Sequence, residues 1–129
     1  MSPDLKLLLW SIALALVQVI IAVLGANSQI PLAALAGNRE PSLPDLTGWA
    51  GRAERAHRNM MNNLPLFIAL VLIAQLAGKT NATTALGAEL FFWGRLAYAV
   101  IYVAGLPWLR TVSWLVSVIG LILIIAQLL

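Results

Sequence analysis

The residues best suited to bind a charged ligand are concentrated in one stretch, 51–65. A helix turns by about 100° per residue, so side chains three or four positions apart share a face. Guanidinium groups bind carboxylate or phosphate through paired hydrogen bonds, and asparagine amides suit a peptide backbone. The stretch therefore predicts a site for a small, multiply charged, peptide-like anion. An arc of about 120° contains Arg52, Arg55, Arg58, Asn59 and Asn62.

A second polar stripe follows later in the chain. Arg95, Tyr98 and Tyr102 stand at i, i+3 and i+7, so they also share a face. Arg110 comes after a short turn that contains Pro107. If the two stripes face each other, they form a basic pocket near the membrane interface, where an arginine or tyrosine would favour the thiolate form of a bound thiol.

Several kinds of site are excluded or disfavoured. The chain has no cysteine and a single histidine, His57, so it offers neither a thiolate nucleophile nor a histidine-based metal site. His57 falls about 200° from Arg55 on the wheel and should point away from the basic face. Glu89 and Arg95 do not share a face, so we do not expect them to pair.

The elements that carry these residues are expected to span a membrane. The hydrophobic fraction is 61% and the charged fraction 10%, whereas soluble domains average about 45–50% and 25%. A span needs about 20 apolar residues. The pattern predicts an all-α integral membrane protein, a single domain built as an antiparallel bundle of four transmembrane helices. The spans are expected at about 5–25, 48–78, 84–103 and 108–128.

Single residues within the spans and the first loop lead to further predictions. The first span reads as an uncleaved helix, with Gln18 near mid-membrane and hydrogen-bonded to a neighbouring helix. Loop 26–47 should contain no helix, because Pro31 and Gly37 interrupt any helical pattern. Thr47, or Asp45, is expected to cap the second span, which Pro65 should kink.

The basic residues also predict orientation. The arginine-rich end should face the cytoplasm and both termini the opposite side, by the positive-inside rule. A plainer interpretation of Arg52, Arg55 and Arg58 remains open, in which these side chains only reach toward anionic headgroups and fix topology.

Three motifs resemble those of the MAPEG family, the membrane-associated proteins of eicosanoid and glutathione metabolism. The first is Arg55-Ala56-His57-Arg58-Asn59 followed by Pro65; the others are 95–102 and 106–111. The resemblance covers nearly the whole chain, and the chain is most similar to the short bacterial members. It therefore implies a bacterial inner-membrane protein.

The resemblance implies a homotrimer that binds glutathione between neighbouring subunits, near the cytoplasmic face. By this resemblance, Arg55 and Asn59 would hold the glutathione backbone and carboxylates, and Arg110 would be the catalytic residue that stabilises the thiolate. Members conjugate glutathione to lipophilic electrophiles, and some reduce lipid hydroperoxides. The full set expected to bind glutathione is Arg39, Arg55, Arg58, Asn59, Asn62, Arg95, Tyr98 and Tyr102.

One position departs from the family pattern. Three residues after Asn59 the family has a glutamate, which would receive the ammonium group of the ligand and balance an arginine; this chain has Asn62. Two functions follow as alternatives. The chain is either a membrane-bound glutathione transferase or a non-catalytic protein of the same fold that binds a lipid or a partner complex.

Overall fold

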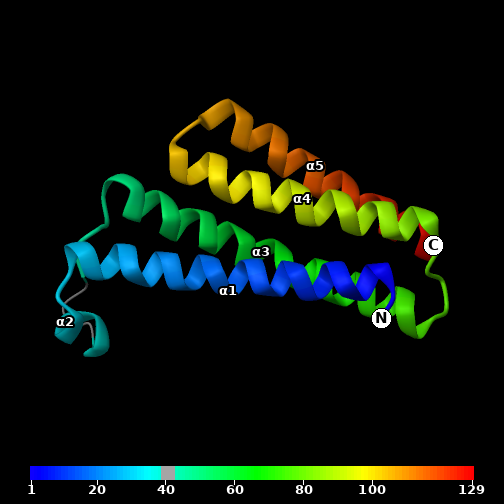
Figure 1. The fold of residues 1–129 in the computed structure, drawn as a ribbon, viewed down its shortest axis with the longest axis horizontal. Coiled ribbons are helices and arrows are strands. Elements are labelled where there is room, and N and C mark those ends of the chain that lie inside the picture. The colour runs from blue at the N-terminus through cyan, green and yellow to red at the C-terminus, as the bar shows by residue number, and fades with distance from the viewer. Residues whose placement is uncertain (39–42) are drawn as a thin grey trace.

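The computed structural model describes residues 1–38 and 43–129. Every regular element within these residues is a helix, and the two long pairs, α1 with α3 and α4 with α5, lie side by side (Figure 1). The two termini lie at the same end of the molecule (Figure 1). The predicted all-α architecture with four long helices is confirmed. The helices are α1 (Pro3–Gln29), α2 (Leu32–Ala36), α3 (Gly48–Leu76), α4 (Ala82–Ala104) and α5 (Pro107–Leu128).

Each of the four long helices is long and apolar enough to cross a membrane. Large apolar side chains cover the outside of the bundle, and Leu16, Leu24 and Val100 are 60%, 61% and 64% exposed. Such exposure is unfavourable in water and favourable in hydrocarbon, because the hydrophobic effect scales with apolar surface left in water. The chain is therefore an integral membrane protein.

The helix ends follow from local side-chain chemistry. At the start of α1 the Ser2 hydroxyl accepts a hydrogen bond from the Leu5 N–H at 3.3 Å. Asn81 and Thr84 form a reciprocal capping box at the start of α4, with bonds of 2.8 and 2.9 Å. Gly105 ends α4 with φ of +84°, a conformation that favours glycine. The helices match the predicted spans to within a few residues.

A short helix, α2, occupies part of the first loop, so the expectation that loop 26–47 contains no helix is wrong. Pro31 precedes this helix with φ of −57°, and Gly37 follows it. Pro31 occupies the N-cap position with extended ψ of 142° and so lies just outside the helix, and the Leu-Ala run that follows has high helix propensity. The same residues that predict a turn therefore bound a single helical segment.

The start of α3 is held by a side chain from α1. Thr47 occupies the N-cap position, but its side chain makes no capping bond, so that part of the prediction is wrong. Instead the Gln29 carboxamide accepts from the Thr47 N–H at 2.9 Å and donates to the Thr47 carbonyl at 2.7 Å. This pair of bonds fixes the end of α1 to the beginning of the arginine-bearing helix.

The core joins the two helix pairs. Phe67 of α3 stacks on Phe91 of α4 with ring centroids 4.1 Å apart. α4 and α5 approach so closely at Gly94 that an added Cβ would lie 2.9 Å from the Ser117 backbone nitrogen. A Cβ on Gly120 would likewise lie 2.8 Å from the Phe91 nitrogen, as expected for a glycine that permits close helix contact.

Candidate anion-binding site

Tyr102 connects three helices at the arginine-rich end of the bundle. The Arg55 Nε of α3 donates to the Tyr102 hydroxyl at 3.2 Å. The Arg110 guanidinium of α5 lies over the same ring, with Cζ 4.5 Å from the centroid. Arginine stacks favourably on an aromatic face, because the positive charge meets the negative π surface. The tyrosine ring thus holds two guanidinium groups close together.

A cavity of about 180 Å³ lies beside this arrangement and is lined by residues of all three helices. The Tyr98 ring in its wall is 5.5 Å from the Tyr102 ring, centroid to centroid. The neighbouring Asn63 amide donates to the Asn59 backbone and side-chain oxygens at 2.8 and 3.2 Å. No lining residue is a carboxylate. The lining residues are Asn59, Tyr98, Arg110, Thr111 and Trp114.

Arg95 lies behind the Tyr98 ring in the protein interior. Its residue is 1% exposed, and its Cζ is 4.3 Å from the Tyr98 centroid. Among residues 1–38 and 43–129, none forms a hydrogen bond to its Nε, Nη1 or Nη2. An ionised group buried without a partner costs stability, because lost hydration is not replaced. The stack on Tyr98 gives only partial compensation.

Two of the predicted arginines are engaged away from the cavity. Arg52 donates from Nε to the Val103 carbonyl at 2.9 Å, in the last turn of α4. Arg58 pairs with Glu54 and lines a separate cavity of about 340 Å³. The predicted clustering of these two side chains with Arg55 is therefore corrected. The wheel fixes the direction of Cβ, but a long side chain reaches whichever acceptor lies nearest.

Two further predicted residues are not brought to the cavity. Asn62 is exposed on α3 and does not line it. Arg39 lies outside the described residues. His57 lies on the other side of α3, as predicted, beside Glu54 and Arg58 in the separate cavity. Of the predicted set, the structure gathers Arg55, Asn59, Arg95, Tyr98, Tyr102 and Arg110.

Trp114 and Thr111 complete the cavity wall, and the sequence reasoning gave neither of them a role in the pocket. The available signal was spacing: Trp114 stands four positions after Arg110, so the two share a face of α5. The indole adds an apolar surface to an otherwise polar wall, which would suit a ligand with both charged and apolar parts.

The arrangement favours negative charge. Arg110 carries positive charge in the cavity wall, Arg55 carries another at the Tyr102 hydroxyl, and Arg95 adds a third behind Tyr98. Opposite charges attract more strongly where protein and lipid exclude water, since the effective dielectric constant is lower there. A carboxylate, or a thiolate held beside Arg110, would be stabilised by this field.

Comparison with known protein families matches the chain to the MAPEG family. The model of the MAPEG family matches residues 7–129, essentially the whole chain. The match includes all of α2 to α5 and most of α1. A search of curated proteins gave no match.

Proposed function

The chain belongs to the MAPEG family, and from this premise we propose that it binds glutathione, or a related thiol, and transfers it to lipophilic electrophiles. The family consists of membrane proteins that use glutathione and lipid substrates. The observation that carries the proposal is Tyr102, which is hydrogen-bonded to Arg55 and covered by Arg110 beside the cavity.

Each residue has a role that its chemistry supports. Arg55 and Asn59 would hold the carboxylates and backbone of the tripeptide, and Arg110 would stabilise the thiolate. With a chloroarene as the second substrate, the thiolate sulfur bonds to the ring carbon. The carbon–chlorine bond then breaks, and chloride leaves with its electron pair. The thiol proton is lost to water before the attack.

The test measures conjugation of glutathione to 1-chloro-2,4-dinitrobenzene by the purified protein. Arg110→Ala and Arg55→Ala should each lower the rate by about 100-fold or more, the usual loss when one charge-stabilising donor is removed. Lys6→Ala is the matched control, because it removes an exposed cation near the start of α1 and should keep full activity. Full activity in both arginine variants would overturn the site assignment.

The proposal includes a homotrimer in the bacterial inner membrane, with the arginine-rich end toward the cytoplasm. A cavity of about 180 Å³ is small beside ligand pockets of about 300–1,000 Å³. A neighbouring subunit that completed the site would supply the missing volume.

The proposed orientation places both termini outside the cytoplasm. A reporter enzyme that is active only outside the cytoplasm should therefore be active when it is fused after Leu129. A stably expressed but inactive fusion would show the opposite orientation.

A second function is favoured by one specific observation. The family's glutamate is replaced by Asn62 in this chain. The fold could then serve a non-catalytic protein that binds a lipid or a partner complex. Titration calorimetry separates the two functions, since an absence of heat at millimolar glutathione favours the second. Binding gained by Asn62→Glu would show that the change at this position had disabled the family site.

A further inference from the structure

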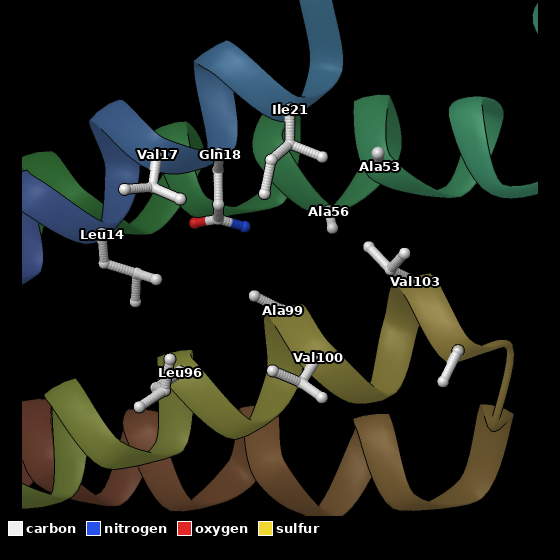
Figure 2. Close-up of a pocket in the computed structure, with 11 residues that line it drawn as sticks. Leu14, Val17, Gln18, Ile21, Ala53, Ala56, Leu96, Ala99, Val100 and Val103 are labelled. Carbon is white, nitrogen blue, oxygen red and sulfur yellow. The ribbon is translucent and has the colours of Figure 1, made fainter. Parts of the chain in front are cut away.

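A groove of about 450 Å³ runs between α1 and α4, apart from the candidate anion-binding site. Ala53 and Ala56 of α3 form its floor (Figure 2). The α4 residues that line it include Leu96, Ala99 and Val103, which lie on a different face of the helix from Tyr98 and Tyr102. The groove and the anion-binding cavity are therefore separate features on two sides of α4.

Gln18 is the one polar side chain among the residues that line this groove. Figure 2 shows its carboxamide pointing from α1 into the space between α1 and α4. The residue is 7% exposed, and its Oε1 is buried with no hydrogen-bond partner in the part of the chain that the structure describes. Within residues 1–38 and 43–129, this oxygen therefore does not form the hydrogen bond to a neighbouring helix that was predicted for Gln18.

This unpaired oxygen contrasts with the buried Ser11 hydroxyl, which lies about two turns earlier on the same helix. The Ser11 hydroxyl donates to the Leu7 carbonyl at 2.8 Å and so is satisfied within α1. A carboxamide oxygen left unpaired in apolar surroundings costs stability, and no water is available in hydrocarbon to replace the missing bond. The groove thus offers an apolar channel with one hydrogen-bonding group that still needs a partner.

The groove is open to the lipid phase. Val17 and Val100 stand on its two sides and are 50% and 64% exposed. A ligand dissolved in the bilayer could therefore enter sideways without passing through water. Its volume lies within the range of about 300–1,000 Å³ that is usual for small-molecule sites.

We propose that the groove binds an aliphatic chain that carries a hydroxyl group along its length, with this hydroxyl hydrogen-bonded to the Gln18 carboxamide. The hydroxyl belongs inside the chain rather than at its end, because the groove continues about one helical turn on either side of Gln18, to Leu14 and Ile21. A hydroxyl both donates and accepts, so it satisfies either orientation of the amide.

The test compares two esters that differ only in an internal hydroxyl, methyl 12-hydroxystearate and methyl stearate. Binding to the detergent-purified full chain is measured by titration in native mass spectrometry. The hydroxylated ester should bind about fivefold more tightly, as expected for one hydrogen bond. Gln18→Leu should bind the two esters equally. Val103→Phe, which fills the groove, should weaken binding of both.

Two variants control for general effects. Ser11→Ala removes a buried polar side chain of α1 that does not line the groove, and Leu16→Phe enlarges an apolar residue that also lies outside it. Both variants should keep the preference. Equal binding of the esters by the wild-type protein would overturn the proposal. So would a preference that survives in Gln18→Leu, or unchanged binding in Val103→Phe. None of these readouts depends on glutathione, so the proposal stands or falls separately from the proposed transferase activity.

Discussion

At the scale of single residues, Arg95 is expected to lower the stability of the fold and to favour ligand binding. Its guanidinium is buried behind Tyr98 and lacks hydrogen-bond partners among the described residues. Buried charges without partners are often more costly than an apolar side chain of similar size. A protein that keeps such a group is expected to use its charge, here to attract an anion into the cavity that Tyr98 lines.

Arg95→Met should therefore stabilise the protein without ligand and impair the site. The thermal unfolding midpoint should rise by several degrees, because a charge that lost its hydration is replaced by an apolar side chain. The added stabilisation that glutathione gives the wild-type protein should disappear. Unfolding in detergent, followed by intrinsic fluorescence with and without glutathione, measures both effects.

Arg52→Met is the matched control for this substitution. Arg52 is only partly buried, and its Nε is bonded to the Val103 carbonyl at the end of α4. Its loss leaves that carbonyl without its partner, so the midpoint should fall. If Arg95→Met unfolds at a lower temperature than the wild-type protein, the guanidinium has a stabilising partner after all, and its proposed role is wrong.

The residue scale also shows how far the sequence could predict the site. Spacing predicts that Tyr98 and Tyr102 share a face, and the short turn after α4 predicts that Arg110 lies near them. Rigid aromatic rings and a short turn leave few alternatives. Arg52 and Arg58 could not be placed in this way. Each has several rotatable bonds and finds a nearby acceptor, the Val103 carbonyl or the Glu54 carboxylate.

At the scale of elements, the α4–α5 pair is the closest contact of the bundle and depends on small residues. At Gly94, an added Cβ would lie 2.9 Å from the Ser117 nitrogen and 3.0 Å from the Ser113 carbonyl oxygen. Both neighbours are backbone atoms, which cannot move without shifting α5. This contact also sets the position of Arg110 and Trp114 relative to Tyr98.

Gly94→Ala should destabilise the protein by about 1–3 kcal/mol, the usual cost of overpacking a tight interior. Gly37→Ala is a suitable comparison, because Gly37 lies outside the α4–α5 pair. The Cβ added there would be 3.3 Å from its nearest neighbour, the Ala33 carbonyl oxygen. Denaturant or thermal unfolding in detergent reports the difference. Equal stability of the two variants would mean that α4 and α5 can separate at little cost.

The elements were predictable to different degrees. The four spans follow from length and hydropathy, and the capping box of Asn81 and Thr84 sharpens the start of α4. α2 was missed because a five-residue helix leaves too short a pattern between Pro31 and Gly37. The bridge between Gln29 and Thr47 was also missed, since residues 18 positions apart share no local signal.

At the scale of the whole molecule, α4 separates two binding features of different chemistry. One face contributes Tyr98 to the wall of the anion-binding cavity and carries Tyr102 beside it, and another contributes Leu96 and Val103 to the apolar groove. The first lies beside cationic side chains, and the second is open to lipid. The proposed transfer of a charged thiol to an apolar molecule would need access to both kinds of environment, and the two faces of α4 are consistent with that need.

The last prediction concerns assembly. The anion-binding cavity holds about 180 Å³, whereas pockets for small ligands usually hold about 300–1,000 Å³. A single subunit is therefore expected to offer part of the site, with the remainder supplied by a neighbour. In mild detergent, light scattering should give a protein mass equal to three chains of 13.9 kDa each. Dilution should dissociate the trimer and weaken glutathione binding together. The protein concentration at which half of the trimer has dissociated should equal the one at which half of the binding is lost, because the two processes are linked.

Arg55→Ala separates assembly from binding in this experiment. Arg55 is exposed in the single chain, and its described partner is Tyr102 of the same chain. The variant should keep the trimeric mass and lose affinity for glutathione at every protein concentration. A monomer that binds glutathione as tightly as the undiluted protein would contradict the prediction, since it would show that residues of one chain suffice. In that case the cavity beside Tyr102 would have to enlarge when the ligand enters, and the change would be seen as altered Trp114 fluorescence in the monomer.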